Sequence, residues 1–116
     1  MSFDIMAALV PALADALGVP CSTTVPEKRP ASFVTIERTG GAFSLGKDEP
    51  ALAIQTWAMT EGAAYDLALM AREWLLECWQ AIPEVCRVVV DGIVHFPDPD
   101  SRQERYQLNV YMVTRA

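Results

Sequence analysis

The sequence has little positive charge and does not cluster what it has. Nine Lys and Arg residues against 15 Asp and Glu residues give the 116-residue chain a net charge of −6. Binding to naked nucleic acid depends on local positive charge that neutralises phosphates. We therefore expect no direct, sequence-specific binding to nucleic acid.

Long apolar runs are also missing. No stretch reaches the ~20 apolar residues that a membrane-spanning helix needs. The first residues lack the basic start and the apolar core of a signal peptide. We expect a mature protein that begins near Met1, has no membrane partner and is assembled in the cytoplasm.

Histidine and cysteine are scarce: the chain has one histidine and three cysteines. An odd number of widely spaced cysteines does not suit a disulfide framework, so Cys21, Cys78 and Cys86 are expected to be free thiols, buried as small apolar groups. A single histidine, His95, cannot build a multi-histidine metal site, and its place in a predicted strand favours a structural role. No nucleophile, acid and base recur in an arrangement typical of catalysis. We expect no enzymatic activity.

Two stretches have part of the spacing of ligand-binding loops. Gly41–Lys47 matches a phosphate-binding loop, but the next residue is Asp48 where Ser or Thr should stand, and no helix is expected to follow. Asp98, Asp100 and Glu104 lack the further ligand and the glycine of a calcium loop. We therefore expect no nucleotide, no metal and no cofactor.

Two helices are predicted. The first covers residues 4–17, is capped by Asp4 or Ser2, and ends at Gly18. Pro11 predicts either a kink or a helix that starts near Pro11. The second covers residues 61–80, is capped by Thr60 and is stopped by Pro83. The expected core stripes are Ile5, Leu9, Leu13 and Leu17 in the first helix, and Leu67, Ala71, Trp74 and Cys78, widened by Ala63, Ala64, Met70 and Leu75, in the second.

Alternating apolar residues predict the strands. Gly40-Gly41 is expected to break a strand and to open a loop that runs to about Glu49. Asp91-Gly92 is expected to be a turn, and residues 97–104 a polar loop. The predicted strands are residues 32–39, 51–59, 85–91 with 93–96, and 105–115, with a short one near 22–25. The order α-β-β-α-β-β predicts one α+β domain over residues 1–116, with a largely antiparallel sheet of four to five strands.

The second helix carries a further apolar strip, opposite its core stripe. Tyr65, Leu69 and Leu76 lie on it, Trp79 lies at its margin, and Arg72 is among the charged residues that border it. Contiguous exposed apolar groups mark contacts. Two interpretations are open: the first helix covers the strip, or the strip is a surface for association between copies.

Charged residues flank the predicted loops and strand ends. One interpretation is that they pair with acidic residues of a neighbouring copy, which fixes the register of a contact more than its affinity. The other is ordinary solvated surface charge. The basic residues are Arg29, Arg38, Lys47, Arg102 and Arg105, and the acidic ones are Asp48, Glu49, Asp98 and Asp100.

Several short motifs follow one another in a recognisable order. They are Arg29-Pro30-x-x-Phe33-Val34, Arg38-Thr39-Gly40-Gly41, Asp48-x-Pro50, Gln55-x-Trp57-Ala58, Pro97-Asp98-Pro99-Asp100-Ser101 and Arg105-Tyr106-Gln107. Their order and spacing over residues 19–115 resemble small tail-completion, or tail-terminator, proteins of long-tailed bacteriophages and prophages. These motifs are structural, so the resemblance assigns no catalytic residue to this chain.

The resemblance implies a twisted mixed sheet packed by helices and a virion protein at the head-proximal end of the tail. It also implies a homo-oligomeric ring, commonly a hexamer, that caps the tail-tube protein and meets the head–tail connector. The loops Gly40–Glu49 and Pro97–Glu104, with the second helix strip, are the candidate contacts. The alternatives are a neck or head-completion connector protein, and a non-phage small-ligand binding module with a closed apolar pocket.

Overall fold

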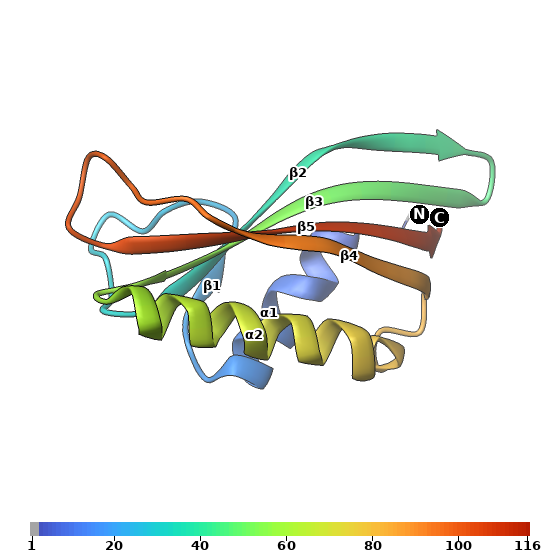
Figure 1. The fold of residues 1–116 in the computed structure, drawn as a ribbon. Coiled ribbons are helices and arrows are strands. Elements are labelled where there is room, and N and C mark those ends of the chain that lie inside the picture. Colours follow the sequence, from blue (N-terminus) through green and yellow to red (C-terminus); the bar gives the residue numbers. More distant parts are fainter. Residues whose placement is uncertain (1–2) are drawn as a thin grey trace.

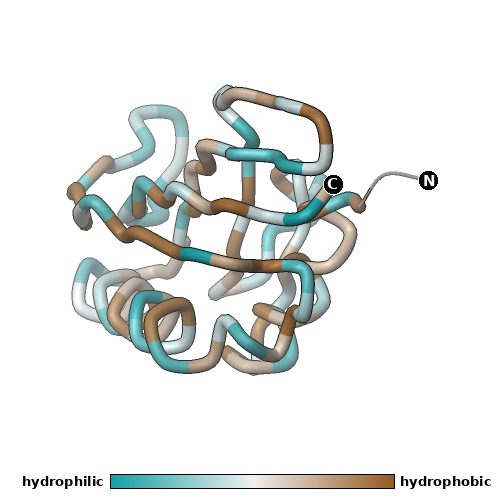
Figure 2. The backbone as a smooth tube through the Cα atoms, turned by 90° about the vertical axis from the view of Figure 1, so that its right-hand side faces the viewer, coloured by the Kyte–Doolittle hydropathy of each residue, from teal (hydrophilic) through white to brown (hydrophobic). Residues whose placement is uncertain are grey.

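The chain forms one five-stranded sheet with both helices on the same face (Figures 1 and 2). The computed structural model describes residues 3–116, so the suggested cap Ser2 and the expected start at Met1 lie outside the described part. The strands are β1 (Cys21–Ser22), β2 (Phe33–Ser44), β3 (Lys47–Ala58), β4 (Val85–His95) and β5 (Glu104–Arg115), and the helices are α1 (Ile5–Leu17), α2 (Glu61–Glu77) and the short 3-10 helix η1 (Trp79–Ala81).

The strand order across the sheet is β1-β2-β3-β5-β4. β1 pairs with β2 in parallel, and every other pair is antiparallel, so the sheet is mixed. The α+β class and the order α-β-β-α-β-β are confirmed, with β1 as a short additional strand. Within residues 3–116, no helix is both long enough and apolar enough to span a bilayer.

α1 follows the prediction at both ends. The carboxylate of Asp4 accepts hydrogen bonds from the backbone N–H groups of Met6 and Ala7, and Gly18 ends the helix at φ 67°. The predicted stripe is buried: Ile5, Leu9, Leu13 and Leu17. The helix runs through Pro11, so a start near Pro11 is wrong. Proline costs a helix one backbone hydrogen bond, and burial of the stripe outweighs that cost here.

The segment Gly40–Glu49 is mostly strand, and the predicted loop is wrong. β2 continues to Ser44, β3 starts at Lys47, and only Leu45 and Gly46 form the turn. The two glycines make a bulge, seen as a register shift between Arg38 and Gly40, and they do not break the strand. A similar shift between Val90 and Gly92 replaces the turn expected at Asp91-Gly92, so β4 is one strand.

Gly41 is required by its surroundings. It has φ 115°, and a Cβ atom at this position would lie 2.1 Å from the backbone oxygen of Glu49. Only glycine fits so close an approach between β2 and β3. The bulge therefore lets β2 and β3 stay paired up to their turn, and we define residues 40–51 as the arm. The β3 half of the arm also pairs with β5, up to Lys47 opposite Arg115.

α2 is shorter than predicted and is followed by η1. The Thr60 side chain caps it by accepting from Ala63 N–H, and its buried residues are Ala64, Leu67, Ala68, Ala71 and Leu75. Ala63, Met70 and Cys78 were expected on the core side but are exposed. Cys78 is exposed because it follows the last helical residue, and Cys86 because it lies on the edge strand β4. The prediction of a buried thiol is therefore wrong for Cys78 and Cys86. Cys21 is half-buried, and this burial raises the pKa of its thiol to about 11.

Candidate assembly surfaces on the open face of the sheet

The sheet face without helices, here called the open face, carries a row of polar side chains. The indole N–H of Trp57 donates to Thr35 Oγ1 at 3.1 Å, and Thr35 Oγ1 donates to Gln55 Oε1 at 3.2 Å. Gln55 Nε2 donates to Gln107 Oε1 at 3.0 Å, and Gln107 Nε2 donates to Asn109 Oδ1 at 3.0 Å. These five residues, here called the polar ladder, cross β2, β3 and β5. Because each of these side chains is hydrogen-bonded to the next, the ladder holds the side chains of the open face in one arrangement.

An aromatic pair is buried on this face although no helix covers it. Phe33 and Trp57 stack with ring centroids 5.2 Å apart, and their exposed fractions are 0% and 2%. The guanidinium of Arg105 lies 4.7 Å from the Trp57 ring centroid and 4.0 Å from that of Phe96, and Arg29 lies 5.3 Å from Trp57. Arg105 Nε also donates to the Phe96 carbonyl at 2.7 Å. Two arginines thus take the place of an apolar covering layer.

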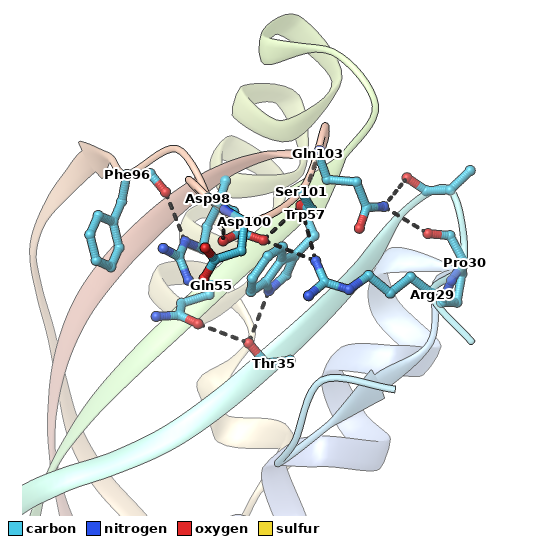
Figure 3. A network of polar contacts seen from close by, with 12 residues as sticks. Arg29, Pro30, Thr35, Gln55, Trp57, Phe96, Asp98, Asp100, Ser101 and Gln103 are labelled. Carbon is cyan, nitrogen blue, oxygen red and sulfur yellow. Dashed lines mark hydrogen bonds and ion pairs between the residues drawn. The ribbon is translucent and has the colours of Figure 1, made fainter. Parts of the chain in front are cut away.

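The loop from Pro97 to Gln103 is attached to the segment before β2 (Figure 3). The carboxylate of Asp98 accepts from Ser101 Oγ at 2.6 Å, from Asp100 N–H at 3.2 Å and from Arg29 Nη1 at 3.0 Å. These bonds, with that from Ser101 contributing most, lower the pKa of Asp98 to about 2. The buried Gln103 donates through Nε2 to the Pro30 carbonyl at 2.9 Å.

Four of the six motifs behind the phage resemblance therefore meet in space, although they lie far apart in the sequence (Figure 3). The other two meet apart from this cluster, where Arg38 pairs with Asp48. Neither helix contributes to this cluster. It joins Arg29 and Phe33 with Gln55 and Trp57, and with Asp98, Ser101 and Arg105. The predicted polar loop 97–104 is thus a packed part of the open face.

The acidic side chains of the arm form ion pairs with basic residues in or just before the arm. Arg38 and Asp48 form a bidentate pair, with Nη1–Oδ2 at 2.6 Å and Nη2–Oδ1 at 2.8 Å. The hydrogen bonds from Arg38 lower the pKa of Asp48, which is buried, and raise that of Arg38. Lys47 and Glu49 lie 3.3 Å apart. Asp48, Glu49 and Asp98 thus have basic partners in their own chain, and pairing across copies stays a prediction for the exposed Asp100 and Arg102.

The second strip on α2 is not closed off by α1. Tyr65 and Leu76 are 42% and 51% exposed, Arg72 is exposed and Leu69 is half-buried. Tyr65 packs on Tyr106 with centroids 5.2 Å apart. The interpretation in which α1 covers the strip is therefore wrong for its two ends.

His95 has the structural role that was predicted. Its Nε2 lies 3.2 Å from Glu104 Oε2, and its ring stacks on Tyr106 with centroids 4.7 Å apart. The Tyr106 hydroxyl in turn donates to Glu61 Oε1 at 2.8 Å, which links β5 to the start of α2. Over residues 3–116, no three His, Cys, Asp or Glu side chains are grouped so that they could hold a metal ion.

Two hollows on the open face were not predicted. They form over β4 and β5, which follow each other in the sequence, and the outward-facing valines of β4 were the one signal that could have indicated them. The small-ligand alternative requires a closed pocket, whereas both hollows open onto the sheet surface. The larger, about 350 Å³, is lined by Glu49, Arg87, Val89, Tyr111, Met112 and Val113, and the smaller, about 260 Å³, by Val94, Phe96, Gln107 and Asn109.

No protein-family model matches the chain, and no curated protein matches it. The phage resemblance therefore depends on the sequence motifs alone.

Proposed function

We propose that the chain is a phage or prophage tail terminator, a virion protein that forms a homo-oligomeric ring on the head-proximal end of the tail tube. The ring, by resemblance a hexamer, occupies the growing end of the tube and blocks further addition of tube subunits. It then offers its other side to the head–tail connector. The mechanism is steric, so it needs no cofactor and no catalytic residue.

The observation that carries this proposal is the number of separate exposed apolar surfaces on so small a domain. A closed ring needs two different patches for its neighbours, and a terminator needs further surfaces for tube and connector. Besides Val25 and Met59, the exposed large apolar side chains fall in three places: Phe43 and Leu45 on the arm, Val89, Val94, Phe96 and Tyr111 on the open face, and Tyr65, Met70 and Leu76 on α2. Exposed apolar groups that gather in patches are typical of interaction surfaces.

The rigidity of the open face also supports the proposal. A subunit that stops a polymer must present a fixed shape, because ordering a mobile surface on binding costs free energy and weakens the contact. The polar ladder and the arginine-covered Phe33–Trp57 pair hold this face without a helix. Arg38 and Asp48 hold the base of the arm in the same way.

Deletion of the gene in its phage tests the proposal. We expect overlong tails, or tails that fail to join heads, when particles are measured by electron microscopy. Complementation with the wild-type gene is the control. Virions of normal length and infectivity from the deletion would contradict the role. Tails of normal length beside heads with incomplete necks would instead indicate the neck or head-completion alternative.

The small-ligand binding module is the second candidate, favoured only by the hollow of about 350 Å³. It predicts a monomer or dimer in which a ligand shifts the NMR signals of Val89 and Tyr111. Light scattering separates it from a ring, and tail lengths from the deletion separate it from a terminator that assembles only on the tube.

A further inference from the structure

The arm ends in two exposed apolar side chains that its own turn does not need. Leu45 is fully exposed and Phe43 is 65% exposed. The turn depends on Gly46, which has φ 80°, and hairpin turns usually carry polar residues or glycine. The side chains of Phe43 and Leu45 therefore add no stability to their own copy through burial.

The larger hollow is a matching acceptor. Val89 and Tyr111 in its walls are 39% and 49% exposed, and the full lining is Val89, Tyr111, Met112 and Val113 with the charged Glu49 and Arg87. A cavity of about 150 Å³ lined by apolar side chains takes one benzene molecule. The hollow of about 350 Å³ thus has room for a phenyl ring and a leucine side chain together.

The tip and the hollow are separate patches near the same end of the sheet. The tip is the turn between β2 and β3, whereas the hollow lies mainly over β5 and β4, with Glu49 of the arm in its lining. In Figure 1 this turn lies at the same end of the sheet as the start of β4. When the tip of each copy enters the hollow of the next copy, two different patches meet, and such a heterologous contact can close into a ring.

We propose that the arm tip of one copy, Phe43 and Leu45, docks into the hollow of a second copy, lined by Val89, Tyr111 and Val113. This inference rests on the proposed ring and specifies its subunit contact. The contact buries apolar groups on both sides beside Glu49 and Arg87, so its affinity should come mainly from the buried apolar area.

Cross-linking between two separately labelled populations tests the contact. The exposed Cys78 and Cys86 are first replaced by serine, and Cys21 stays because its half-buried thiol, with a pKa of about 11, is little ionised at neutral pH. One population carries Leu45→Cys and the other, with a size tag, carries Val89→Cys. A short bismaleimide added to the mixture can then join the two introduced thiols only between copies.

We expect mixed dimers from Leu45→Cys with Val89→Cys, and at least tenfold fewer with Val94→Cys, which lies on the same strand of the open face but outside the larger hollow. Samples at ~1 mM protein would populate even a contact with a millimolar Kd. Equal yields from the two partners, or no mixed dimer at this concentration, would overturn the inference.

Charge at the tip gives an independent readout. Leu45→Asp should raise the dissociation constant of self-association by about tenfold or more in sedimentation experiments, with no change in thermal unfolding because Leu45 is exposed. Val25→Asp, at an exposed apolar site away from the arm, is the matched control. If Leu45→Asp and Val25→Asp associate alike, the tip does not dock on another copy, and binding of wild type alone to lipid vesicles would assign it to a membrane surface.

Different results would refute the terminator role and the contact between tip and hollow. Overlong tails from the deletion without the predicted cross-link would retain the terminator role and refute this contact. The cross-link together with normal virions from the deletion would retain the contact and refute the role.

Discussion

The two faces of the sheet are held by different physical means. The face under α1 and α2 is a conventional core in which Leu9, Leu13, Ile54 and Leu108 are fully buried. The open face buries Phe33 and Trp57 equally well, but under arginine side chains, amides and an attached loop. The comparison teaches that a small domain can keep one sheet face free for contacts when polar side chains exclude water from its aromatic centre.

The largest expected effect tests whether both faces contribute similar stability. Trp57→Ala on the open face should lower the free energy of unfolding by about 3–5 kcal/mol, and Leu13→Ala on the helix face by about 2–5 kcal/mol. Chemical denaturation of each variant measures both values. A loss below about 1 kcal/mol for Trp57→Ala would mean that the arginine cover does not bury the ring in solution.

The next effect concerns the arm. Gly41→Ala should destabilise the hairpin by about 1–3 kcal/mol, because φ 115° is strained for alanine and its Cβ would meet the backbone oxygen of Glu49. Gly92→Ala is the matched control, since open space surrounds that position. Hydrogen exchange of the amides in residues 40–51 measures the local change. Equal protection in the two variants would rule out the tight bulge.

A smaller effect follows from pH. The folded-state pKa of Asp98 is about 2 and its ordinary value is 3.8. A lowered carboxyl pKa adds stability that is complete above the ordinary value and is lost as pH falls toward the folded value. Stability should therefore decrease from about pH 5 downward. Asp98→Asn should remove part of this slope and about 1 kcal/mol at neutral pH, measured by denaturant titration.

Asp48 contributes in the same direction, since Arg38 lowers its pKa. Asp98→Asn therefore flattens the pH profile only in part. An unchanged profile in Asp98→Asn would show that the attached loop does not hold Asp98 as described. Asp100→Asn, at an exposed carboxylate that accepts no hydrogen bond in the described part of the chain, is the control.

The smallest effect on folding is expected on α2. Leu76→Glu should change the free energy of unfolding by no more than about 0.5 kcal/mol, because the side chain is largely exposed. If the α2 strip is a contact between copies, the same variant lowers the association state in light scattering. Unfolding of Leu76→Glu would instead place this residue in the core and remove the difference between the exposed and covered sides of the helix.

Local sequence patterns predicted the helix face well. Leucines at intervals of four placed the core side of α1, Asp4 and Gly18 marked its ends, and alternating apolar residues predicted the strand that became β3. These features depend on neighbours within one helix or strand. The glycine pairs were less informative, because Gly40-Gly41 and Asp91-Gly92 can end a strand or bulge it, and the partner strand decides which.

The sequence by itself determined the elements, their amphipathic sides and the acidic composition, because these depend on residue type and spacing over a few positions. Only the tertiary structure decided that Asp48 and Asp98 pair inside the chain, that the loop 97–103 joins the open face, and that β2 and β3 stay paired up to the turn that carries Leu45. Each of these depends on which strands lie side by side, and no local periodicity specifies that order.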